Sequence, residues 1–196
     1  MTYIIEILRQ EHRNTEKLLR VLDRELSVFD RGGRPDYATV LAAIDYFKDY
    51  PDSCHHPKED FIFERLKIRD AAAAADVGDL EAEHLEGAKR LRRVAQTVEA
   101  VYNDQDLVRN TVSNIMHEFI DRERLHMMME ERIVFPAALK ALRASDWAEI
   151  ALKLADREDP LSQPGLEDKF SRLRRKILEL EDEAEAARRT AGSQNE

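Results

Sequence analysis

Apolar residues recur along most of this chain at intervals of three and four positions, which is the repeat of an amphipathic helix. These intervals differ from the alternation of two that a half-buried strand shows. Glycine and proline, six of each, interrupt the pattern at a few places and mark where helices end or bend. The pattern therefore predicts an all-α protein.

Residues 1–143 contain four long amphipathic segments with short connections between them. The first is expected to end near Asp30, because the turn sequence Gly32-Gly33-Arg34-Pro35 follows it. Four such helices are the parts of an antiparallel four-helix bundle, in which each helix buries its apolar face. The segments are residues 1–30, 37–67, 79–102 and 106–143.

Prolines interrupt two of these segments. Proline has no backbone N–H and crowds the preceding turn, so Pro51 and Pro57 predict a kink or a break in the second segment. Pro136 lies late in the fourth segment and predicts a bend there. The alanine run 71–75 and the Asp76-Val77-Gly78-Asp79 sequence after it are interpreted as a loop.

The remaining residues, 144–190, predict a C-terminal helical extension. Ser145 is a suitable N-cap for a short helix, and the stretch 157–165 is typical of a linker. Disorder is expected from Arg188 onward and includes the tail 191–196. The last helix could bury its apolar stripe either by packing on the bundle or by pairing with a second copy in a homodimer. That stripe consists of Leu166, Phe170, Leu173, Ile177 and Leu180.

Composition narrows the partners and the compartment. Charged residues make up 36% of the chain and its formal net charge is −9, which disfavours nucleic acid and anionic membrane surfaces as partners. No stretch approaches the roughly 18 apolar residues of a membrane-spanning helix, and the first residues lack the basic region of an export signal. Cys54 is the only cysteine, so no internal disulfide forms. These features favour a cytoplasmic protein.

One spacing of chemically reactive residues occurs twice, as His55-x-x-x-Glu59 in the second segment and His126-x-x-x-Glu130 in the fourth. A carboxylate four residues after a histidine lies on the same helix face, about one turn further along. Each pair can therefore offer two ligands to one point in space.

Two further histidines lie on the apolar faces of the other segments. His12 and His84 each follow a leucine of their own stripe by four residues, so both are expected to point into the bundle. His117 lies about half a turn out of phase with the fourth segment's ligand pair. His56 lies about 100° from its neighbour and is expected behind the ligands or at the rim of the site.

These six inward-facing groups need a common partner. A polar group without a partner costs on the order of 1–3 kcal/mol in an apolar core, and six would lie at one level of the bundle. Imidazole suits iron and zinc, and two carboxylates can bridge two metal ions. A pair of iron ions would satisfy all six groups.

The order of these residues resembles that of the hemerythrin-like (HHE cation-binding) domains of bacteria. The resemblance covers roughly residues 1–143. It rests on Glu11-His12-Arg13, His55-His56-Pro57-Lys58-Glu59-Asp60, Glu83-His84 and His126-Met127-Met128-Met129-Glu130-Glu131, the last leading to Phe135-Pro136.

The resemblance implies a four-helix bundle around a non-haem di-iron centre, two iron ions with a bridging oxo or hydroxo group. Its implied function is to bind, sense or react with a small oxidant, namely dioxygen, nitric oxide or peroxide, in iron handling or the stress response. If the protein is an enzyme, weak peroxidase or catalase-like chemistry is implied. The implied metal ligands are His12, His55, Glu59, His84, His126 and Glu130.

The chain departs from the oxygen-carrying hemerythrins at two positions. Those proteins have a second histidine one turn after the ligand in the third helix, where this chain has Ala88. They also have a His-x-x-x-x-Asp spacing in the fourth helix, where this chain has Glu130. Reversible oxygen carriage is therefore not expected. The space beside His84 suits an open coordination position for a small oxidant.

Other interpretations remain open. Any one of these histidines alone is more often a hydrogen-bonded core or surface residue than a ligand. Glu81-x-x-His84 and Glu123-x-x-His126 match the spacing of ferritin-like di-iron oxidases, in which Glu16 would have to replace the ligand from the first helix. A third interpretation is a regulatory interaction module whose C-terminal helix responds to the state of the metal.

Overall fold

The computed structural model describes residues 3–103, 105, 107–157 and 166–193, and in these residues all regular structure is helical. The all-α prediction is therefore confirmed. The α-helices are α1 (Tyr3–Asp30), α2 (Tyr37–Tyr50), α3 (His56–Arg69), α4 (Ala71–Val77), α5 (Leu80–Tyr102), α6 (Arg109–Met129), α7 (Phe135–Ala141), α8 (Ala144–Arg157) and α9 (Leu166–Ser193). Two π-helical turns are η1 (Pro51–His55) and η2 (Glu130–Val134).

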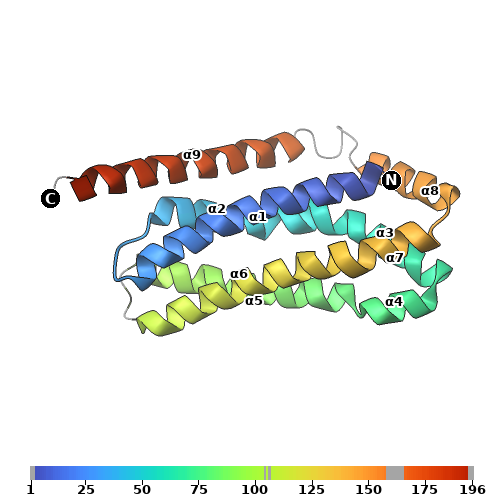
Figure 1. Cartoon of the computed structure of the whole chain (residues 1–196), viewed down its shortest axis with the longest axis horizontal. Coiled ribbons are helices and arrows are strands. Elements are labelled where there is room, and N and C mark those ends of the chain that lie inside the picture. The colour runs from blue at the N-terminus through green and yellow to red at the C-terminus, as the bar shows by residue number, and fades with distance from the viewer. Residues whose placement is uncertain (1–2, 104, 106, 158–165, 194–196) are drawn as a thin grey trace.

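Four rods form the bundle, and Figure 1 shows how they are arranged. They are α1, the continuous run α2–η1–α3, α5, and the continuous run α6–η2–α7, and successive rods run in opposite directions. Short polar turns define their ends. Asp36 and Asp79 cap α2 and α5 by accepting hydrogen bonds from backbone N–H groups of the first turn. The expected four-helix bundle is confirmed.

Both π turns lie where proline interrupts a rod. Pro57 follows η1 and Pro136 follows η2, and neither can donate the backbone hydrogen bond that would continue the regular ladder. His56 N instead donates to Pro51 O, and Phe135 N donates to Glu130 O, each across five residues. Each rod therefore continues past its proline through one π turn, at the place where a kink or bend was predicted.

The interpretation of residues 71–79 as a loop is wrong for most of that stretch. Residues 71–77 form α4, because alanine has the highest helix propensity and Asp70 caps the helix by accepting from Ala73 N. Gly78 then ends it with a φ of +87°, a left-handed conformation that glycine adopts without strain. The connection between α3 and α5 is therefore a short helix packed on the bundle.

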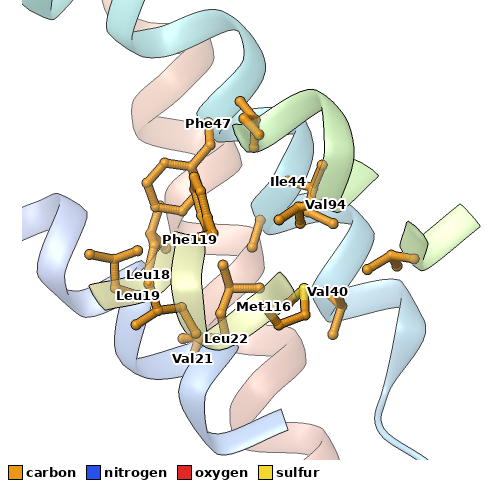
Figure 2. Close-up of a cluster of buried hydrophobic side chains, with 14 of the residues drawn as sticks. Leu18, Leu19, Val21, Leu22, Val40, Ile44, Phe47, Val94, Met116 and Phe119 are labelled. Carbon is orange, nitrogen blue, oxygen red and sulfur yellow. The ribbon is translucent and has the colours of Figure 1, made fainter. Parts of the chain in front are cut away.

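The hydrophobic core has two parts, separated along the bundle. Figure 2 shows the larger part, in which side chains of α1, α2, α5 and α6 interdigitate around Phe47 and Phe119. The smaller part includes Leu8, Phe63 and Phe135, from rod segments near the other end of the bundle. Between the two parts each rod carries polar residues. The core is therefore divided by a polar layer.

The C-terminal helices pack on this bundle. Helix α9 lies along α1 and α2 (Figure 1), and buried Phe170 packs edge-on against Tyr46 and Tyr50, with ring centroids 5.8 and 5.1 Å away. An ion pair of 2.9 Å joins Arg188 to buried Glu25. The stripe of the last helix thus contacts the bundle, and pairing with a second copy remains a prediction.

The ends of this region differ from the sequence expectation in one respect. Helix α9 continues to Ser193, past Arg188, where disorder was expected to begin. Residues 158–165, which contain most of the expected linker, and residues 194–196 lie outside the described part of the chain.

Helix α8 is held to α3 by two hydrogen bonds, 2.8 and 2.7 Å long, from the Arg69 guanidinium to Asp146. In the described residues, none of the helices has the length and apolar composition needed to cross a bilayer.

Candidate metal centre

All six residues that the sequence singled out meet in the polar layer of the bundle. His12 comes from α1, His84 from α5 and His126 from α6. The other three, His55, Glu59 and Glu130, lie in or just after a π turn. Glu59 and Glu130 are 1% and 0% exposed and lie at the centre of the layer. The distance from Glu130 Oε1 to His126 Nε2 is 3.0 Å, and from Glu130 Oε2 to His12 Nε2 it is 3.3 Å.

The donor atoms form two groups that share Glu59. In each group one nitrogen or oxygen atom of every residue lies within 4.8 Å of the corresponding atoms of the others, which is close enough to hold a metal ion. We call the first the His12 group; it consists of His12, His55, Glu59 and Glu130. We call the second the His84 group; it consists of His56, Glu59, His84 and His126.

His56 lies nearer the donor atoms than its helical phase suggested. It was expected behind the ligands or at the rim, yet its ring stacks on that of His84 at 3.7 Å and it belongs to the His84 group. The reason is η1, which ends at His55. A π turn holds one residue more than an α turn, so neighbouring side chains are separated by a smaller angle than on an α-helix. The two prolines around His55 were the available signal, but a kink alone did not give the angle.

Most of the donor atoms at the centre have no hydrogen-bond partner. Both carboxylate oxygens of Glu59 and Glu130, and Nε2 of His84, are buried and lack a hydrogen-bond partner of suitable geometry, although histidine nitrogens lie 3.0 to 3.8 Å from the carboxylates. His12 Nε2 and His55 Nε2 are 3.1 Å apart, and neutral imidazoles would direct two lone pairs at each other there. Buried lone pairs that converge in this way fit shared cations.

Carboxylates behind the histidines fix the orientation of the rings. Glu11 Oε2 lies 2.8 Å from His55 Nδ1, Glu131 Oε1 lies 3.1 Å from His12 Nδ1, and Asp52 Oδ1 lies 2.9 Å from His56 Nδ1. A carboxylate at Nδ1 favours a proton on that nitrogen, which leaves the Nε2 lone pair free for a metal. The three rings therefore present Nε2 to the centre.

Without a metal, protons balance the charge of the centre. Burial by itself would lower the pKa of His12, His55 and His84, but the neighbouring glutamates raise these pKa values to about 9, 10 and 9. Burial would raise the pKa of the Glu130 carboxyl and Glu59 adds to this, but the histidines lower it to about 2. The carboxylates are thus ionised, and they stabilise protons on the same nitrogens that a metal would use, so protons compete with a metal for this site.

His56 has the opposite behaviour. Burial, together with the positive charge of His84, lowers the pKa of His56 to about 4. Its imidazole is therefore neutral near pH 7. A neutral imidazole is the form that binds a metal ion, so this donor needs no deprotonation.

Two pockets reach the centre from different sides. A pocket of about 360 Å³ touches His56, His84 and His126, and its wall includes Gly87 and Ala88 of α5. A second pocket, of about 560 Å³, reaches the centre at His12, between α1 and α6. Solvent-borne molecules thus have routes to both donor groups.

Glu16, Glu123 and His117 belong to neither donor group. Glu16 forms ion pairs with Arg20 and Arg124 on the outside of α1. Glu123 lines the smaller pocket, and burial raises the pKa of its carboxyl. The side chain of Glu81 lies outside the described part. His117 is 46% exposed and its Nε2 lies 3.0 Å from Asp30 Oδ2, so this residue is on the surface.

Comparison with known proteins places this geometry in a family. No curated protein and no solved structure matches the chain. The family model of the hemerythrin HHE cation-binding domain matches residues 3–138, which includes every member of the two donor groups. That match spans well over half of the chain, and the bundle it covers carries histidines and glutamates able to hold metal ions. The chain therefore belongs to the hemerythrin HHE cation-binding family.

Proposed function

We propose that this protein binds two iron ions in the polar layer and uses them to bind, sense or react with a small oxidant. The observation that carries this proposal is the convergence of buried carboxylate and imidazole lone pairs that have no hydrogen-bond partner. Leaving each such group unsatisfied would cost on the order of 1–3 kcal/mol, and a shared pair of cations removes that cost. Imidazole and carboxylate together suit iron.

The two donor groups define where the ions would be held. The His12 group would hold one ion and the His84 group the other, with Glu59 shared between them. Glu130 directs one oxygen toward His126 and the other toward His12, so it also would span the pair. A bridging oxo or hydroxo group would complete the pair. Iron held here would supply electrons and open positions for an oxidant.

The number of donors differs between the two positions. The His12 group offers four donors. The His84 group also offers four, and Glu130 Oε1, 3.0 Å from His126 Nε2, makes a fifth. The third imidazole of the His84 group comes from His56, beside the position where Ala88 leaves space. The position beside Ala88 would therefore have one donor more than the His12 position, and the pocket beside Gly87 still reaches it.

The oxidant would be small, as dioxygen, nitric oxide and peroxide are. The pocket beside Gly87 gives such molecules a route to the pair, and the Glu123 carboxyl in its wall can donate or accept a hydrogen bond there. Roles in iron handling or the oxidative stress response, and a cytoplasmic location, are parts of the same proposal. Peroxidase or catalase-like turnover is its enzymatic form, with Glu123 as the side chain placed to exchange protons in the pocket.

A ferritin-like oxidase receives less support. That site needs a carboxylate from α1, and Glu16 is instead held in ion pairs with Arg20 and Arg124. The α1 donor that faces the other ligands is His12, which lies 3.1 Å from His55 through their Nε2 atoms.

A regulatory role for α9 is a second candidate, and one contact favours it. Phe170 of α9 packs against Tyr50, and Tyr50 directly precedes the π turn that ends at His55. A metal-dependent shift of that turn would therefore reach α9 through one aromatic contact. The predicted homodimer through α9 belongs to this candidate, since an α9 that detaches would expose its apolar stripe.

Iron loading tests the central proposal. Anaerobic loading with Fe²⁺, followed by elemental analysis, should give two irons per chain, and exposure to air should produce oxo-bridged charge-transfer bands in the absorption spectrum. His56→Ala should weaken binding of one of the two irons about 10-fold or more, since it removes a donor from the His84 group alone. His117→Ala, on the surface, is the matched control and should load fully. A single ion per wild-type chain would contradict the proposal.

Metal binding should release protons, with a sign that follows from the pKa shifts. His12, His55 and His84 have pKa values raised above the ordinary 6.5, so they hold protons at pH 7 that a metal must displace. Zinc titration by calorimetry in two buffers of different ionisation enthalpy should show proton release at pH 7 and tighter binding as the pH rises toward 9.

The same shifts give the pH dependence of the metal-free protein. A raised histidine pKa contributes stability that is complete below pH 6.5 and is lost as the pH rises through 9 to 10. The unfolding temperature of the metal-free protein should therefore fall over this interval, and that of the zinc-loaded protein should fall less. Equal slopes would show that these histidines are not the groups being titrated.

Reaction with peroxide separates an enzyme from a sensor or scavenger. Steady consumption of many equivalents of hydrogen peroxide by the iron-loaded protein, lost in His126→Ala, is expected of an enzyme. Bleaching of the absorption bands after one equivalent is expected of a sensor or scavenger. An iron-loaded protein whose spectrum changes with none of peroxide, nitric oxide and dioxygen would contradict both.

Amide hydrogen exchange tests the role of α9. If α9 responds to the metal, its amides should exchange faster in the metal-free protein than in the loaded one. Phe170→Ala removes a buried anchor and supplies the detached reference, and Lys176→Ala, exposed on the same helix, is the matched control. Equal exchange in both metal states would leave α9 with a purely structural role.

A further inference from the structure

A buried lysine lies directly behind the metal centre. Lys58 is 6% exposed, in the first turn of α3, and it belongs to neither donor group. Lysine is almost never fully buried unless it is paired, because its charge loses the solvation of water. Its side chain in this structure makes two polar contacts, one electrostatic and one to the backbone.

The electrostatic contact is with Glu11. Lys58 Nζ donates to Glu11 Oε1 over 3.0 Å, and the other oxygen of Glu11 lies 2.8 Å from Nδ1 of the ligand His55. Glu11 is itself only 6% exposed. Its carboxylate is therefore fixed between a ligand ring on one side and a lysine on the other.

The backbone contact is with the π turn. Lys58 Nζ also donates to the carbonyl oxygen of Cys54, within η1. At this turn the side chains of the neighbouring histidines lie less than the α-helical 100° apart, and His55 joins the His12 group while His56 joins the His84 group. A single amino group thus connects α1, the backbone of the turn and, through Glu11, a ligand ring.

We propose that Lys58 is a positioning residue that locks the π turn, so that two consecutive histidines serve two different metal positions. This inference rests on the proposed metal pair. An α turn in place of η1 would set the two side chains about 100° apart. The turn has no regular hydrogen-bond ladder at Pro57, and Lys58 supplies a donor to it from the side.

If Lys58 fixes the π turn in this way, one effect is expected that a merely stabilising role of Lys58 would not produce. Lys58 and His56 have different direct partners: Lys58 contacts Glu11 and Cys54, whereas His56 contacts Asp52, His84 and the neighbouring His55 ring. If the turn couples them, removing Lys58 should abolish most of the benefit that His56 brings to metal binding. A double-mutant cycle measures this coupling.

The experiment uses the full-length protein and Co²⁺, whose visible spectrum reports ligand geometry. In the wild-type background His56→Ala should weaken one of the two Co²⁺ sites, the one at the His84 group, about 10-fold to 100-fold. In the Lys58→Met background the same change should have an effect of less than about 3-fold, because His56 is already displaced. Lys67→Met, on the exposed side of α3, is the matched control and should leave the His56→Ala effect intact.

A second measurement is independent of any metal. In the metal-free protein, amide exchange of residues 52–56 should be faster in Lys58→Met than in Lys67→Met, while the exchange of α5 stays the same. If Lys58→Met does not fold, Glu11→Gln provides the test, since it removes the charge that holds the lysine and should give the same two effects in weaker form.

The outcomes separate this inference from the proposed function. An undiminished His56→Ala effect in Lys58→Met, or unchanged amide exchange in the turn, would overturn the lock while leaving the metal pair intact. A wild-type chain that binds no metal pair would overturn the proposed function, and the exchange measurement would still decide whether Lys58 holds the turn.

Discussion

The burial of a polar layer across the middle of a hydrophobic bundle is the constraint on which this structure depends. Each of the four rods gives up its apolar pattern at the same level, between the core around Phe47 and Phe119 and the smaller core around Phe135. Carboxylates with less than about 2% exposure there are far too costly to keep as isolated charges. Protons on the histidines meet this cost in the metal-free chain, and a pair of cations would meet it more completely.

The sequence was sufficient for most of the architecture. Helical periodicity, the Gly32-Gly33 turn and the prolines locate the rods, because each depends on local backbone chemistry. The failure at residues 71–79 has an equally local cause: polar and glycine residues after the alanine run suggested a loop, but Asp70 supplied a cap and the alanines supplied the propensity. Propensity over seven residues is a weak signal until packing on α3 selects it.

Most residues of the candidate site, like most of the fold, could be predicted from the sequence. Helical phase alone directs His12, His84 and the two His-x-x-x-Glu pairs inward, and the structure brings all of these together. Phase did not give the proximity of His56 to the donor atoms, because the usual angle per residue does not hold where η1 passes into α3. Lys58 and Glu11 were also beyond reach, since their roles depend on contacts between α1 and α3 that no spacing within one helix encodes.

The π turns have a consequence for how the site could be altered. Each acts as if one additional residue had been inserted into a helix, and the helix keeps its axis while everything beyond the insertion is rotated relative to what precedes it. Deleting a single residue from η1 would restore a regular helix and rotate Glu59, which follows it, by about 100° relative to α2. The number of residues in the π turn, and not only the identity of the ligands, thus defines this centre. Single-residue insertions or deletions there would be more disruptive than most substitutions.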